Sequence, residues 1–147
     1  MPRNAVAYDE DFFAWTEEQA RLLRAGEVAA LDLANIAEEI ESMGRSLRRE
    51  LRSRIIVLLV HLLKWQYQPG FRSRSWSSTI REQRRQIGDL LDDAPSLEAT
   101  VSAELIRLYQ PARDRAVDET GLPETAFPAD CPFTPEQILA EGFLPED

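Results

Sequence analysis

The sequence predicts an all-α fold, a single antiparallel bundle of four to five main helices with a central third helix and a short C-terminal helix. Apolar residues recur at helical spacing through nearly every segment, and residues that cap helices stand at the segment ends. The sequence shows no alternating strand pattern and no internal repeat. A chain of 147 residues, 44% of them hydrophobic, is long enough to bury one sizeable core.

The first two expected helices are bounded by capping residues. The first begins near Asp9, a good N-cap, and ends at Gly26, since glycine favours helix C-termini. The second begins near Asp32 and is amphipathic. Gly44 is predicted to separate it from the third helix. The apolar stripe of the second helix consists of Leu33, Ile36, Ala37, Ile40 and Met43.

The third helix is expected over about residues 46–67, ending before Pro69 and Gly70. From Ile55 onward it is apolar on nearly every side, which is typical of a helix at the centre of a bundle. We therefore expect its second half to be the core helix. Its first half, rich in arginine, should face solvent or an acidic neighbour.

Two further helices and an irregular tail complete the prediction. Ser75 is expected to cap the fourth helix, and Pro95 opens the fifth. Pro111 falls inside the fifth pattern and removes a backbone donor, which predicts a kink or break there. Residues 121–147 read as an irregular tail whose short helix, begun by Thr134, packs on the bundle.

The whole chain, residues 1–147, is predicted to be one domain, with residues 1–7 flexible. Its longest strongly apolar run, residues 55–63, is too short to span a membrane, which takes about 20 residues. The first residues lack the layout of a secretory signal, and a lone cysteine forms no internal disulfide. These features favour a cytoplasmic location.

Charge is distributed unevenly along this acidic chain, whose formal net charge is −9. Residues 1–41 hold 3 basic and 10 acidic side chains, residues 42–88 hold 11 and 2, and residues 89–147 hold 3 and 14. Two interpretations stay open: internal neutralisation between acidic and basic helices, or a basic surface for an acidic partner.

Several chemistries lack the residues that they need. With His61 as the one histidine and Cys131 as the one cysteine, neither a zinc site nor a dimetal carboxylate site can be assembled in the usual way. No basic residue near Cys131 in sequence would activate its thiol, and no glycine-rich phosphate loop is present. We therefore assign no catalytic residue, metal or cofactor, and do not expect an enzyme.

Two groups of residues are candidates for binding. One is a polar and aromatic cluster between the third and fourth helices, which could also simply fix that corner of the fold. Its members are His61, Lys64, Tyr67, Gln68, Arg72, Arg74 and Trp76. The other is a basic face formed by Arg45, Arg48, Arg49, Arg52, Arg81, Arg84 and Arg85.

Parts of the sequence resemble a bacterial family catalogued as domain of unknown function 29. The resemblance covers about residues 8–143 and rests on EEIESMGRSLRREL (38–51), HLLKWQYQP (61–69), RSRSW (72–76), TIREQRRQI (79–87) and CPFTPEQIL (131–139). It implies a small all-helical cytoplasmic protein. The family has no assigned activity, so the resemblance implies no functional residues.

Three functions remain as hypotheses. The favoured one is a non-enzymatic helical module that binds a protein partner or another copy of itself, for example as a homodimer. The alternative is a nucleic-acid-binding protein that uses the basic face, although the acidic flanks would repel phosphate. The third is a small-ligand binder or enzyme centred on residues 61–76, which requires a concave pocket there.

Overall fold

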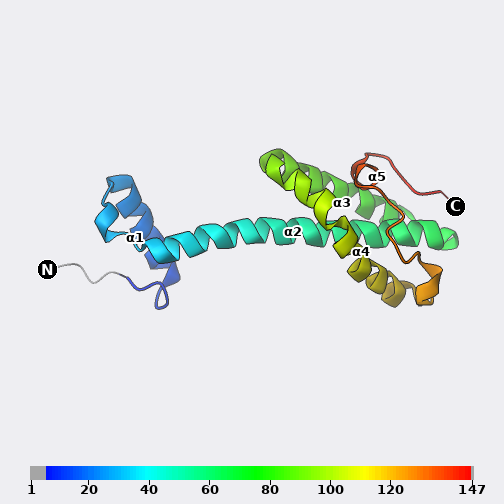
Figure 1. Ribbon diagram of the computed structural model, residues 1–147, viewed down its shortest axis with the longest axis horizontal. Helices are drawn as coiled ribbons and strands as arrows, with labels where there is room; N and C mark the ends of the chain where they lie inside the picture. Colours follow the sequence, from blue (N-terminus) through cyan, green and yellow to red (C-terminus); the bar gives the residue numbers. More distant parts are fainter. Residues whose placement is uncertain (1–5, 147) are drawn as a thin grey trace. The chain divides into compact units, whose positions relative to one another are not determined.

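The computed structural model describes residues 6–146, and all regular structure in that range is helical (Figure 1). This confirms the predicted all-α bundle. The contacts divide the chain into two compact units, one ending at Ser46 and the other beginning at Leu47. We call them unit 1 and unit 2 and describe each by itself. Most of the segment predicted to be flexible, residues 1–7, lies outside the described residues.

Unit 1 contains α1 (Phe12–Ala25) and the beginning of α2 (Leu33–Tyr67). The N-cap of α1 is Asp11, whose carboxylate accepts a hydrogen bond from the Ala14 amide at 3.0 Å, so the sequence placed this cap two residues too early. Gly26 ends the helix as predicted, with φ of +71°, a conformation that favours glycine.

A small core joins α1 to the beginning of α2. The side chains buried in unit 1, among the described residues, are Trp15, Gln19 and Leu22. The Trp15 indole donates a hydrogen bond to the Asp32 carboxylate at 3.0 Å, and the Gln19 side-chain oxygen accepts one from the Asp32 amide at 2.8 Å. Hydrogen bonds from Asn35 and Trp15 lower the pKa of Asp32, which keeps its carboxylate charged at the start of α2.

Helix α2 runs without interruption through Gly44, so the predicted second and third helices are one helix of 35 residues. The expectation of a break was wrong because a helical glycine costs only about 1 kcal/mol relative to alanine. Arg45 offsets part of that cost by pairing with Glu38 at 2.8 Å and Glu41 at 3.8 Å, both on the helical turns that precede it. The helix ends at Tyr67, before Pro69, as predicted.

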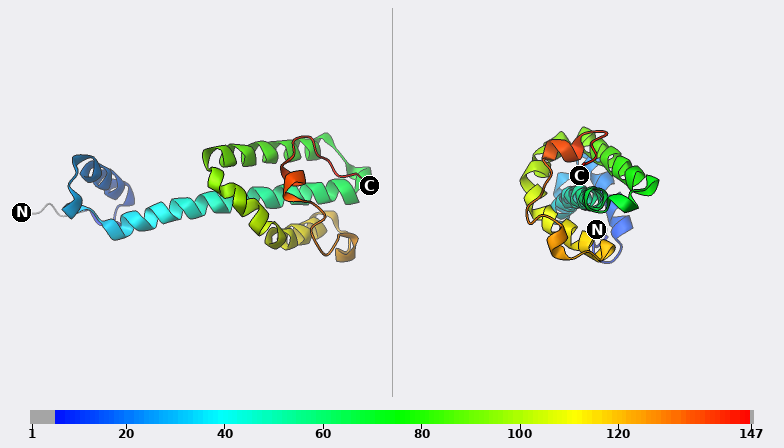
Figure 2. Two further views of the ribbon diagram at one scale, coloured as in Figure 1. Left: turned by 45° about the horizontal axis from the view of Figure 1, so that its top comes forward. Right: turned by 90° about the vertical axis from the view of Figure 1, so that its right-hand side faces the viewer.

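Unit 2 is built around the second half of α2. Figure 2 shows α3 (Arg74–Asp93), α4 (Glu98–Thr120) and the C-terminal segment placed around it. Its apolar side chains form the centre of the core, as expected of a helix that is apolar on nearly every side. Those that are fully buried are Leu51, Ile55, Leu58, Leu59, Val60, Leu62 and Leu63.

Two boundaries in unit 2 differ from prediction. The cap of α3 is Ser73, which accepts a hydrogen bond from the Trp76 amide, rather than Ser75. Helix α4 continues through Pro111, so the break expected there is absent. Both Pro111 and Arg107, whose carbonyl loses its usual helical partner, are exposed to solvent. Water can therefore satisfy that carbonyl, while buried residues on both sides hold the helix in place.

The C-terminal tail packs into unit 2. Phe127, Phe133 and Ile138 are buried in its core. The Tyr109 hydroxyl donates a hydrogen bond to the Pro128 carbonyl at 2.5 Å. The short helix α5 (Pro135–Leu139) begins with a complete capping box between Thr134 and Gln137, the element that the sequence predicts. The tail thus forms one wall of unit 2.

Candidate functional site

The predicted polar corner brings Lys64 and Trp76 together. The Lys64 ammonium lies 4.9 Å from the centre of the Trp76 ring and 3.4 Å from a carboxylate oxygen of Glu119. The other carboxylate oxygen of Glu119 forms an ion pair with Arg115 at 3.3 Å. Burial raises the pKa of Glu119, but the two cations outweigh it and the pKa is lowered overall. The Lys64 ammonium is therefore engaged within the fold by both an aromatic ring and a carboxylate.

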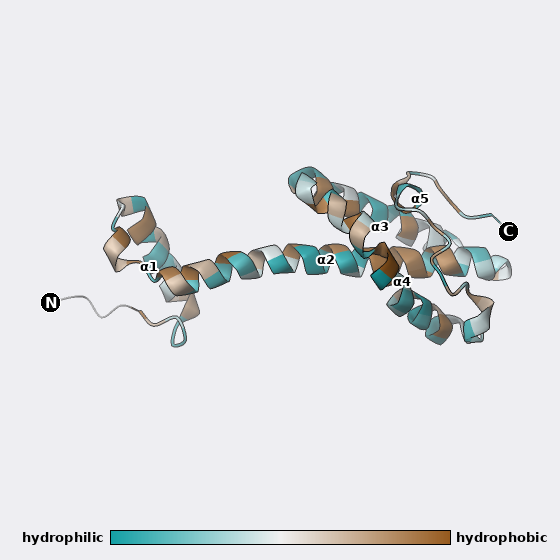
Figure 3. Ribbon diagram, in the orientation of Figure 1, coloured by the Kyte–Doolittle hydropathy of each residue, from teal (hydrophilic) through white to brown (hydrophobic). Residues whose placement is uncertain are grey.

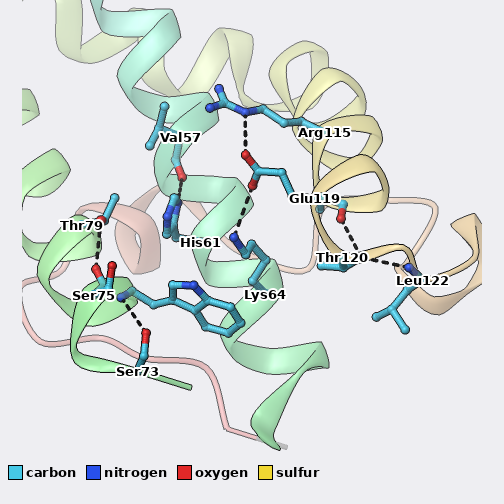
Figure 4. A network of polar contacts seen from close by, with 12 residues as sticks. Val57, His61, Lys64, Ser73, Ser75, Thr79, Arg115, Glu119, Thr120 and Leu122 are labelled. Atoms are coloured by element: carbon cyan, nitrogen blue, oxygen red, sulfur yellow. Dashed lines mark hydrogen bonds and ion pairs between the residues drawn. The ribbon is translucent and has the colours of Figure 1, made fainter. Parts of the chain in front are cut away.

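His61 projects from α2 in the same region, and its Nδ1–H donates a hydrogen bond to the Val57 carbonyl at 2.8 Å (Figure 4). Burial lowers the pKa of its imidazole. Within the described residues no carboxylate is hydrogen-bonded to this ring and no nucleophile is oriented by it. The Val57 carbonyl thus fixes the orientation and the tautomer of the His61 ring.

The other corner residues are engaged separately. The Arg72 guanidinium lies 5.3 Å from the Trp65 ring and donates to the Trp65 carbonyl at 2.7 Å. Tyr67 meets Phe127 edge to face at 5.6 Å, and burial raises the pKa of its hydroxyl. Gln68 begins a single turn of 3-10 helix, and Arg74 is the exposed first residue of α3.

The seven arginines of the predicted basic face have different surroundings. Arg45 pairs with Glu38, Arg52 forms a two-bond pair with Glu104, with one bond at 2.7 Å, and Arg85 pairs with Glu82 and Asp89. Arg84 donates to main-chain carbonyls near α5. Within the part of the chain that the structure describes, Arg48, Arg49 and Arg81 form neither an ion pair nor a hydrogen bond through their side chains.

The partners of these arginines also lie in different directions. Arg52 reaches α4 through Glu104, whereas Arg84 reaches the C-terminal segment through Ile138. Hydrogen bonding from Arg52 lowers the pKa of Glu104, as a stable ion pair should. Most of the positive charge is thus neutralised or anchored within the fold, which does not favour one continuous cationic surface for nucleic acid.

A different surface stands out in unit 1. Among the described residues, seven of the ten exposed large hydrophobic side chains lie within residues 12–43. Figure 3 shows apolar residues along the length of α2, including the part that belongs to unit 1. We define the α2 apolar face by its exposed members Leu33, Ala37, Ile40, Met43 and Gly44. Leu33, Ile40 and Met43 each expose about 60% of their surface.

The sequence predicts this stripe as one side of an amphipathic helix but does not show whether the same chain covers it. Two signals could have identified it as uncovered: charge is dense around the stripe, and Ala37 and Gly44 leave little side chain to bury. On residues 43–50, a stretch of α2 that includes Gly44, every side chain is exposed. A helix that is exposed to solvent on all sides is usually stabilised by a binding partner or by ion pairs along its own surface.

The described residues contain no group of three or more His, Cys, Asp or Glu side chains placed to hold a metal ion. Burial raises the pKa of the Cys131 thiol, which makes it a poor nucleophile. Within the same range, no helix is both long enough and apolar enough to cross a lipid bilayer.

Comparisons with known proteins give one positive result. A family model described as "Domain of unknown function DUF29" matches residues 7–144. No curated protein and no solved structure matches the chain.

Proposed function

Because the chain belongs to the family described as domain of unknown function DUF29, whose description names no activity, we propose a function from the geometry alone. The protein is a non-enzymatic, self-associating helical module, and a second copy of the chain covers the α2 apolar face. The observation that carries this proposal is the concentration of exposed large hydrophobic side chains in residues 12–43. Contiguous exposed apolar surface of this kind marks interaction sites in soluble proteins.

The energy available from covering this face favours reversible association. Complete burial of a Leu, Ile or Met side chain is worth about 1.5–3 kcal/mol. With about 60% of Leu33, Ile40 and Met43 exposed, covering them on two copies yields roughly 5–11 kcal/mol. That gain is similar to the cost of bringing two proteins together, about 4–15 kcal/mol. We therefore expect concentration-dependent association, in the micromolar range or weaker.

The order of residues on α2 favours a second copy as the partner. In an antiparallel pair centred on Ile40, Ile36 lies level with Gly44 of the partner subunit, and Ala37 lies level with Met43 of the partner subunit. A large residue thus meets a small one on each flank. Such a face is complementary to itself, as a two-fold symmetric interface requires.

Charge along α2 favours the same antiparallel direction. Glutamates occupy three of the four positions in residues 38–41, and arginines occupy three of the five positions in residues 45–49. Parallel pairing sets both stretches against their own kind, whereas antiparallel pairing centred on Ile40 brings only the acidic stretches together. It places the arginines level with residues 31–35 of the partner subunit, where an aspartate stands. Because these side chains are exposed, their contribution is to orientation more than to affinity.

Sedimentation velocity over a wide range of concentrations tests the proposal. We expect the wild-type protein to shift from monomer to dimer as concentration rises. Ile40→Glu should remain monomeric, because it places a charge at the centre of the face. Ile106→Glu is the matched control, since Ile106 is a large exposed hydrophobic residue of α4, 83% exposed and outside the face.

Two results would contradict the proposal. One is a wild-type protein that stays monomeric up to millimolar concentration. The other is a dimer that Ile40→Glu and Ile106→Glu weaken equally, because the α2 apolar face would then have no special role. Circular dichroism of both variants checks that the helical fold is retained.

A further inference from the structure

A cleft between α3 and the C-terminal segment of unit 2 combines apolar walls with arginines. It has a volume of about 730 Å³. This is within the range of about 300–1,000 Å³ that is typical of small-molecule sites. The residues that line the cleft include Ile80, Arg81, Arg84, Leu139, Glu141 and Leu144.

Arg84 is a fixed cation at this cleft. Its Nε–H donates to the Ile138 carbonyl at 2.9 Å, and its guanidinium lies 5.9 Å from the centre of the Phe143 ring. Burial lowers the pKa of Arg84, and the hydrogen-bond partners of its guanidinium among the described residues are carbonyl oxygens rather than carboxylates. Its positive charge is therefore held in place by neutral acceptors, without a carboxylate to neutralise it.

Arg81 lies one helical turn before Arg84 and is exposed. It forms no ion pair with any described residue. Arg85 also lines the cleft, but Glu82 and Asp89 already neutralise it, with contacts at 2.8 and 3.2 Å. One further carboxylate, Glu141, lines the cleft. Two unneutralised guanidinium groups and one carboxylate leave the cleft with a net positive charge of one.

From this charge balance and the apolar walls, we propose that the cleft binds a small aliphatic monocarboxylate. The carboxylate group is held by Arg81 and Arg84, because a guanidinium matches the two oxygens of a carboxylate. The aliphatic chain packs against Leu139 and Leu144, which are half-buried and have apolar surface left to cover. A single negative charge neutralises the cleft, while a polyanion would also meet the repulsion of the acidic chain.

Amide chemical shifts of the ¹⁵N-labelled full chain, titrated with octanoate below its micelle concentration, test this site. Acetate supplies the charged group alone, and octanol supplies the chain alone. We expect saturable shifts at Arg81, Leu139 and Gly142 with octanoate, and much weaker binding of the other two. Arg81→Gln should weaken octanoate binding roughly tenfold or more, the effect of losing a charged hydrogen bond. Arg74→Gln should leave it unchanged, since Arg74 is exposed on the same helix outside the lining residues.

The proposal is overturned if octanol binds as tightly as octanoate, because the arginines would then contribute nothing. It is equally overturned if Arg81→Gln has no effect while its spectrum remains that of the folded protein. Shifts confined to residues 12–43 would also overturn it, because they would place the ligand on the exposed apolar side chains of unit 1. None of these outcomes depends on whether the protein self-associates.

Discussion

Replacing Gly44 with alanine should have opposite effects on the stability of the single chain and on self-association. A Cβ atom built at Gly44 meets no other atom within 4 Å, and Gly44 has no positive φ. Alanine therefore fits the helix without strain and stabilises it by about 0.5–1 kcal/mol. For a chain of this size, that raises the melting temperature by roughly 1–4 °C.

In the proposed dimer, however, Gly44 lies against Ile36 of the partner subunit. Added methyl groups at both symmetric positions push the two helices apart, since the distance between packed helices depends on the side chains at the contact. We expect Gly44→Ala to weaken association measurably while it stabilises the isolated chain. Thermal unfolding at low protein concentration measures the first effect, and sedimentation equilibrium measures the second.

Gly88→Ala is the matched control, because Gly88 lies inside α3 and a Cβ there also meets no atom within 4 Å. It should raise stability by a similar amount and leave association unchanged. If Gly44→Ala lowered the stability of the monomer, α2 would not be a regular helix at that position. If it left association unchanged or strengthened it, the close approach at Gly44 would be refuted.

Two further predictions concern unit 2. Leu58→Ala should lower the free energy of unfolding by about 2–5 kcal/mol, because Leu58 is fully buried in the core; urea denaturation measures this, and a loss below 1 kcal/mol would contradict the central position of α2. Glu104→Gln should destabilise the protein at pH 7 by about 1 kcal/mol or less, since the pair with Arg52 is partly exposed. The pKa of Glu104 lies below its ordinary value of 4.5, so the extra stability of wild type over Glu104→Gln should disappear as the pH falls below about 4.5. A stability difference that grew in acid would show that the ion pair with Arg52 does not stabilise the fold.

Local sequence signals were sufficient for the fold class and for several helix ends. Gly26 and the capping box at Thr134 act through neighbours one to three residues away, so their effects can be read directly from sequence. Residues 55–63 are apolar on nearly every side of their helix, and this pattern likewise identified the core helix. The helix break predicted at Gly44 was wrong, and Pro111 does not end its helix, because each carries a local cost that the rest of a long helix can absorb.

The candidate sites were harder to predict because their chemistry depends on distant partners. Arg52 meets Glu104, 52 residues away, and Lys64 meets Glu119, 55 residues away. Neither pairing leaves a signal in local spacing. Amphipathic spacing on residues 33–44 shows that one side of the helix is apolar, but it does not distinguish a face covered by the same chain from one left exposed.

The most direct test of the account is disulfide cross-linking between two differently substituted copies. One copy carries Ala37→Cys and the other Met43→Cys, both with the natural Cys131 replaced by serine. Antiparallel pairing centred on Ile40 predicts that mild oxidation cross-links the mixed pair faster than either copy with itself, because residues 37 and 43 then face each other closely enough for a disulfide. Faster cross-linking of identical copies would indicate parallel pairing, and no cross-linking above the rate of a surface control such as Ile106→Cys would contradict self-association through this face.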